Sequence, residues 1–231
     1  MIAERLAFGV ALLDGRRGGA RGVEVALDPA HPAQERLAAL ARHRVDTTTP
    51  LRVVATLLED PAPPGPSAVV PTRFGLLRAT IDATGELQHS GRIGFGLRGR
   101  PDEAPRSWDA AIIALHLTDA DHVPAFDATE LGAMLQLVQA HDPSNPHDDV
   151  RALAELDDRS REVLLALVEA DSLRSAAAEL GMHHSTIQSR HEALTLALGY
   201  DPRSNLGKMR YIAAGLLYRF TDSLPPYLGE P

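Results

Sequence analysis

The chain has 231 residues, and its 23 Lys and Arg stand against 31 Asp and Glu, which gives a formal net charge of −8. This length allows one large domain or two small ones and suffices to bury a core without disulfides. The lack of cysteine excludes a disulfide scaffold, a zinc ribbon, an iron–sulfur centre and a thiol nucleophile. No apolar run is long enough to span a membrane, and Met1 to Leu13 lack a secretory pattern, so we expect a cytoplasmic protein without a membrane partner.

Residues 1–31 are expected to form a helix and a linker. Within 1–14, Leu6, Val10 and Leu13 have helical spacing. The stretch 15–22, GRRGGARG, then interrupts the pattern. Its glycines and arginines leave open a contact with phosphate or RNA, but the lack of interleaved aromatic residues favours a solvated linker.

Residues 32–148 are expected to form an α+β domain, in which helices cover one face of a mixed, mostly antiparallel sheet. The sequence predicts helices over 32–42, 107–117 and 130–140, and strands over 51–58, 67–71, 74–81, 92–97 and 123–126. Trp108, Ala111 and Leu115 share one helical face, and Ser107 is the expected N-cap. The polar segment 141–149 contains prolines, so we place the domain boundary there, between 148 and 149.

Residues 149–223 are expected to be helical, with a tail over 224–231, and within them 172–198 fits a helix-turn-helix. Ala177 is a small residue where two helices cross, and Gly181 can adopt the positive φ that the turn requires. Ile187 is expected to be buried in the second helix. An ordinary helical hairpin is the alternative, but each of these positions carries the residue type that a helix-turn-helix requires, which favours DNA binding.

The second helix of this unit would enter the major groove with its first turns facing the bases. Gln188 can contact adenine through two hydrogen bonds, and Arg190 can contact guanine or phosphate. Ser185 and Thr186 can hold a phosphate. The full set of candidate DNA-binding residues is His183, His184, Ser185, Thr186, Gln188, Ser189 and Arg190.

The near-neutral charge of the helical region predicts a weak affinity of a single copy for DNA. From Glu155 to Phe220, eight Arg and Lys stand against nine Asp and Glu. Because phosphate contacts supply most non-specific affinity, we expect a monomer to bind DNA weakly and a dimer to be needed.

The segment LRSAAAELGMHHSTIQSRHEALTLALGYDP, with a following helix through GLLYRF, resembles the C-terminal DNA-binding domain of PucR/CdaR-type transcriptional regulators. The recognition turn is matched by His183, Ser185, Thr186 and Ile187, although His184 stands where arginine is common. Leu198, Gly199 and Asp201 match the family's sequence at the segment that leads into the last helix.

The upstream segment GRIGFGLRGRPDEAPRSWDAAIIALHLTD is similar to the end of that family's central GGDEF-like domain. The resemblance covers roughly residues 32–220. It implies a degenerate GGDEF-like, ferredoxin-like domain for regulation or dimerisation at 32–148, double-stranded DNA as partner and a homo-oligomer. Residues 1–31 are too few for the family's N-terminal ligand-sensing domain.

A GGDEF-like domain raises the hypothesis of nucleotide cyclisation, which the residues disfavour. The hairpin PTRFGLLRATID lacks the glycine-rich acidic signature, and the first strand carries no carboxylate before Glu59 and Asp60. The segment 91–99 has no P-loop lysine. We therefore expect no catalytic residues and no enzyme activity.

Histidines suggest a metal site at two places. His141, His147, Asp148 and Asp149 are close in sequence, and His184 and His191 lie two turns apart, but neither spacing matches a known site. We expect no metal and no cofactor. Two hypotheses remain: a transcriptional regulator, whose small-molecule effector is open, and a ligand-binding or protein-interaction module whose helix-turn-helix no longer binds DNA.

Overall fold

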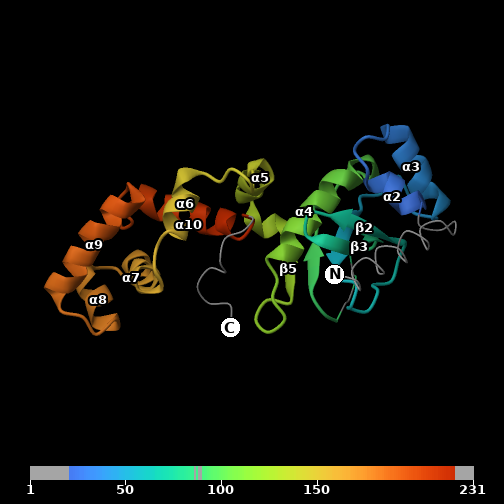
Figure 1. The fold of residues 1–231 in the computed structure, drawn as a ribbon. Helices are drawn as coiled ribbons and strands as arrows, with labels where there is room; N and C mark the ends of the chain where they lie inside the picture. The colour runs from blue at the N-terminus through green and yellow to red at the C-terminus, as the bar shows by residue number, and fades with distance from the viewer. Residues whose placement is uncertain (1–20, 86, 88–89, 222–231) are drawn as a thin grey trace, which may run out of the picture. The chain divides into compact units, whose positions relative to one another are not determined.

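The computed structural model describes residues 21–85, 87 and 90–221. The helix expected at 1–14, most of the linker at 15–22 and the tail at 224–231 lie outside them. The described chain divides into two compact units, one ending at Gly132 and one beginning at Ala133 (Figure 1). The first contains a sheet and helices and the second is helical, so the predicted α+β class is confirmed.

The first unit, here the sheet unit, is built on five strands in the order β2-β3-β1-β4-β5. The central strand β1 is antiparallel to β3 and β4, β2 is antiparallel to β3, and β5 is parallel to β4. The sheet is therefore mixed and mostly antiparallel, as expected. Its strands are β1 (Arg52–Thr56), β2 (Ser67–Thr72), β3 (Gly75–Asp82), β4 (Ile93–Phe95) and β5 (Ala125–Asp127).

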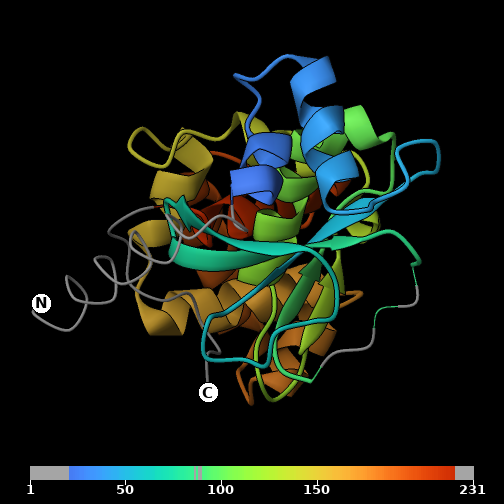
Figure 2. The ribbon, with the colours of Figure 1, turned by 90° about the vertical axis from the view of Figure 1, so that its right-hand side faces the viewer.

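One face of this sheet carries the core of the unit. Val53, Ala55 and Ala79 pack there with Trp108, because alternate strand residues point to the same side. The helices of this unit contribute to that core and lie on one side of the sheet (Figure 2). They are α2 (Arg21–Leu27), α3 (Ala33–Arg42) and α4 (Ala104–His116).

Helix α4 begins earlier than expected, so the prediction that Ser107 is its N-cap is wrong. A 3₁₀ turn at Pro101–Glu103 leads directly into Ala104. Ser107 therefore lies inside the helix, and its hydroxyl oxygen accepts a hydrogen bond from the Val53 backbone N–H at 2.8 Å. Two further differences are helix α2, which the sequence did not predict, and a 3₁₀ turn at Ala128–Leu131 in place of the expected helix start at 130.

The second unit, here the helical unit, starts earlier than the boundary expected between 148 and 149. Helix α5 belongs to it because α5 packs against α10. Its helices are α5 (Met134–Ala140), α6 (Asp148–Ala154), α7 (Asp158–Glu169), α8 (Leu173–Glu179), α9 (His184–Leu198) and α10 (Asn205–Tyr218). None of the helices in the described ranges is long and apolar enough to cross a membrane.

Candidate nucleic-acid interface

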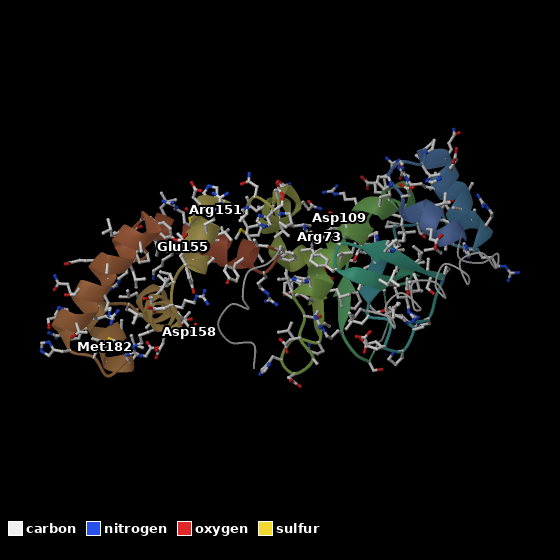
Figure 3. All side chains as sticks on the ribbon, viewed as in Figure 1. Arg73, Asp109, Arg151, Glu155, Asp158 and Met182 are labelled. Carbon is white, nitrogen blue, oxygen red and sulfur yellow. The ribbon has the colours of Figure 1, made fainter. Side chains whose placement is uncertain are left out.

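The turn between α8 and α9 has the geometry that the sequence predicted. Gly181 has φ 62°, a conformation that glycine adopts without steric cost. The Met182 N–H donates to the Ala177 carbonyl at 2.8 Å and the Gly181 N–H donates to the Ala178 carbonyl at 3.3 Å. These two bonds form a Schellman motif, which ends α8 sharply. Figure 3 labels Met182 at this turn.

Buried apolar side chains hold α8 and α9 together. Ala177 and Ile187 are both buried, and the Ile187 side chain is fully shielded from solvent. Leu194 and Leu198 continue the same face of α9 into the core of the helical unit. Because residues seven and eleven positions apart share a helix face, these contacts fix which side of α9 faces solvent.

The start of α9 is held by a histidine cap. The His183 Nδ1 accepts a hydrogen bond from the Ser185 N–H at 3.3 Å and lies 2.8 Å from the Ser185 hydroxyl. Because Nδ1 is the acceptor, the ring proton is on Nε2, which remains able to donate. His183 therefore orients the helix start and presents one donor.

All seven candidate DNA-binding residues are exposed on the first two turns of α9. At about 100° per residue, Ser185 and Ser189 point away from the buried Ile187. Gln188 flanks them, and its Nε2 donates to Glu192 Oε1 at 3.4 Å. The structure thus brings the predicted residues onto one polar surface.

Arg190 lies at the edge of this surface, on the side of α7. Hydrogen bonds from Ser160 lower the pKa of Asp157, the α7 N-cap, and the Arg190 charge lowers it further. Arg190 is therefore close enough to α7 to interact with a carboxylate there.

A histidine–aspartate pair connects α9 to the loop that follows this helix. His191 Nε2 lies 2.8 Å from Asp201 Oδ1. The hydrogen bond from His191 lowers the pKa of Asp201, and the Arg203 N–H contributes. The pairing of His191 with a carboxylate explains this histidine without a metal.

The sequence predicts Ser172 as the cap of α8, and the structure confirms it. Three features of the surface escaped the sequence interpretation: Arg174 is exposed on α8, Glu192 contacts Gln188, and Ser175 completes a capping box with Ser172. Only the capping box has a local signal, because serine three residues after a serine N-cap can reach back to it.

The acidic residues at the other suggested metal site have a different role. Asp149 belongs to the polar segment expected at the domain boundary, but it is buried in α6 and accepts two hydrogen bonds from Arg210 at 2.6 and 2.9 Å. His147 caps α6 through Nδ1. In the described ranges, no group of three or more His, Asp or Glu side chains is arranged to hold a metal ion.

Comparison with known proteins gives little. No family model matches the sequence, and no curated protein matches it significantly. The chain is similar to a solved structure, a regulator of polyketide synthase expression from Bifidobacterium adolescentis. The identity is 13% and the TM-score 0.30, over 88% of this chain and 98% of that one. At this TM-score the likeness carries no weight for function.

Proposed function

We propose that the protein is a sequence-specific transcriptional regulator that binds double-stranded DNA through α8 and α9. The observation that carries this proposal is the α8–α9 unit itself. A positive-φ glycine turn and a buried isoleucine hold a helix whose first turns present only exposed polar residues around that isoleucine. The exposed residues include the serine, threonine, glutamine and arginine types that contact bases and phosphates.

In this proposal the seven surface residues have different roles. Ser185, Gln188 and Ser189 face the base edges, where the Gln188 amide pairs with adenine. Arg190, at the edge beside α7, contacts a phosphate. His183 donates from Nε2, and the Thr186 hydroxyl contacts a second phosphate.

The family assignment is part of the proposal. The residues of the recognition turn and those from Leu198 to Asp201, before the last helix, support a regulator of the PucR/CdaR type. Such a regulator would act in the cytoplasm without enzyme activity. The sheet unit would serve regulation or dimerisation and is the place for a small-molecule effector. The alternative is a ligand-binding or interaction module that no longer binds DNA, which the net charge of −8 favours.

Fluorescence polarisation with DNA from upstream of the gene tests the proposal. Gln188→Ala should weaken binding about 10-fold and relax base preference, because one bidentate contact contributes about 1–3 kcal/mol. Arg190→Ala should weaken binding to all sequences and reduce the salt dependence by about one counterion. Arg42→Ala, an exposed arginine on α3 in the sheet unit, is the matched control and should bind as the wild type.

Equal binding by the wild type and both α9 variants would reject the site. No binding even at low salt, together with a thermal shift on adding a nucleotide or metabolite, would support the alternative module.

A further inference from the structure

Buried polar side chains lie on the face of the sheet opposite helices α2, α3 and α4. Val53, Ala55 and Ala79 point to the core face, which these helices share (Figure 2). Because successive strand residues alternate between the two faces, Thr56 and Thr80 point to the opposite face. Both threonines are 0% exposed. A hydroxyl that is shielded from water in this way needs a hydrogen-bond partner.

Three polar atoms on this opposite face have no hydrogen-bond partner within the described part of the chain. They are the hydroxyl oxygens of Thr56 and Thr80 and the Nε of Arg78, and all three are buried. Thr56 lies directly opposite Arg78 in the pairing of β1 with β3, and Thr80 is two residues further along β3. Directly opposite residues have Cβ atoms about 4.5–5.5 Å apart, and diagonal neighbours lie about 7–8 Å apart. The three side chains therefore adjoin one another and are here called the β1–β3 cluster.

Arg78 brings to the β1–β3 cluster a positive charge that no carboxylate in the described ranges neutralises. Arg52, on the same face, has a different environment. Its guanidinium is paired with Asp82 at 2.8 Å and with Asp127 at 3.1 Å. Because both of these carboxylates are already paired, the charge of Arg78 is left for an anion from outside the described chain.

The surroundings of the β1–β3 cluster suit a small anion. A Cβ atom at Gly65 would lie 3.3 Å from Cγ2 of Thr80, so the loop between β1 and β2 lies against this threonine. Ser67 lies opposite Thr80 on β2 and brings a further hydroxyl to the same face. Arg78 is only half-buried, so an anion can approach from solvent along its side chain. Hydroxyl groups and a guanidinium all donate hydrogen bonds, and an oxyanion accepts from each of them.

We infer that the β1–β3 cluster binds a small oxyanion, the carboxylate or phosphate group of a metabolite. The anion accepts hydrogen bonds from the Thr56 and Thr80 hydroxyls and from the Arg78 guanidinium, which gives each of the three atoms a partner. Such binding stabilises the sheet unit, because a ligand held only by the folded state shifts the unfolding equilibrium. That the anion acts as an effector of DNA binding rests on the proposed function, whereas the anion site itself does not.

Thermal unfolding of the full-length protein, followed by Trp108 fluorescence, tests the site. The probes are inorganic phosphate and acetate, each compared with sodium chloride at equal ionic strength. At about five times its dissociation constant, the anion that binds should raise the midpoint of the Trp108 transition by about 4–8 °C. The transition of the helical unit, followed by circular dichroism, measures the general effect of the salt on folded proteins. The probe with the larger specific shift identifies the group as a phosphate or a carboxylate.

Conservative variants show whether the shift comes from the β1–β3 cluster. Thr56→Val and Thr80→Val each remove one hydroxyl and keep the shape of the side chain. Without the anion, both should be at least as stable as the wild type, because an unpaired buried hydroxyl is lost. With the anion, both should lose most of the shift, and Arg78→Met should lose all of it. Arg42→Met, which removes an exposed arginine on α3, is the matched control and should retain the full shift.

An equal shift in the wild type and in all three cluster variants would overturn the anion site, because the shift would then be a general salt effect. No specific shift with either probe would also overturn it, and a buried water would then account for the hydroxyls. DNA binding separates the two proposals. A specific shift in a protein that binds no DNA would leave the anion site intact and reject the proposed function, whereas DNA binding without a specific shift would do the reverse.

Discussion

The two units of this protein use a glycine for opposite reasons. In the sheet unit, Gly94 makes room: a Cβ atom there would lie 2.2 Å from the Leu115 backbone nitrogen and 2.3 Å from the Ala111 carbonyl oxygen. In the helical unit, a Cβ atom added at Gly181 would meet nothing within 4 Å, so this glycine is needed for its positive φ alone. Gly94 is thus needed for a contact between residues far apart in the chain, and Gly181 for local backbone geometry.

The same contrast appears in how helices begin. In the helical unit, Asp157, Ser172 and Ser204 each cap a helix through a residue three positions ahead. In the sheet unit, Pro32 and Glu103 precede α3 and α4 without a side-chain cap. Helix α4 is instead positioned by the sheet, through the Ser107–Val53 hydrogen bond.

Gly94→Val should have the largest effect on stability and should unfold the sheet unit alone. The added side chain collides with the backbone of α4, which cannot move aside as a flexible side chain could. Trp108, the sole tryptophan, is buried on α4, so its fluorescence reports on this unit. In this variant, we expect Trp108 fluorescence to show no unfolding transition, while the circular dichroism signal of the helical unit persists. Gly215→Ala on α10, where a Cβ meets nothing, is the control and should be neutral or stabilising.

Ile187→Ala should be next in size and should affect the helical unit alone. Removing this fully buried side chain leaves a cavity and is expected to cost about 2–5 kcal/mol. Urea unfolding followed by circular dichroism should show the loss, with the Trp108 midpoint unchanged. A shift of both transitions would show that the two units unfold together.

Gly181→Ala should have a smaller effect, because only backbone conformation opposes it. A non-glycine residue in the left-handed region costs about 1–2 kcal/mol. Thermal unfolding should detect that decrease, and DNA affinity should fall only if α9 also moves. Unchanged stability would contradict the role assigned to the turn.

A fall in pH should distinguish the two units least, because in each of them a buried aspartate is paired with an arginine. Burial raises the pKa of Asp82, but hydrogen bonds from Arg52 and Gly85 outweigh it and leave that pKa below its ordinary value. The Arg210 hydrogen bond lowers the pKa of Asp149 in the helical unit, against a smaller opposing effect of burial.

A lowered pKa means that each carboxylate stabilises its unit above the unfolded pKa of about 3.9. That contribution is lost as the pH falls through the folded value. Urea unfolding between neutral pH and about pH 3 should show both losses. Asp82→Asn should flatten the pH dependence of the Trp108 transition only, and Asp149→Asn that of the helical transition only.

Much of the helical unit was predictable because its signals are local. The turn at Gly181, the buried Ile187 and the exposed residues from His183 to Arg190 follow from spacing within one short segment. The spacing along α10 predicts that Leu206 and Met209 face the core, but both side chains are 66% exposed, because α10 is apolar on more than one side and periodicity cannot tell which side meets the core. The contact of Gln188 with Glu192 depends on rotamers, which spacing leaves open.

The sequence by itself determined the α+β class, the approximate strands, the glycine turn and the set of residues that α9 exposes, since each depends on residue type and on neighbours a few positions away. Only the tertiary structure decided that α4 starts at Ala104, that Asp149 is buried beside Arg210 and that Leu206 and Met209 face outward. These features arise where segments far apart in the chain compete for the same packing surface. That competition is settled by close packing and hydrogen bonding across the fold, which no local pattern contains.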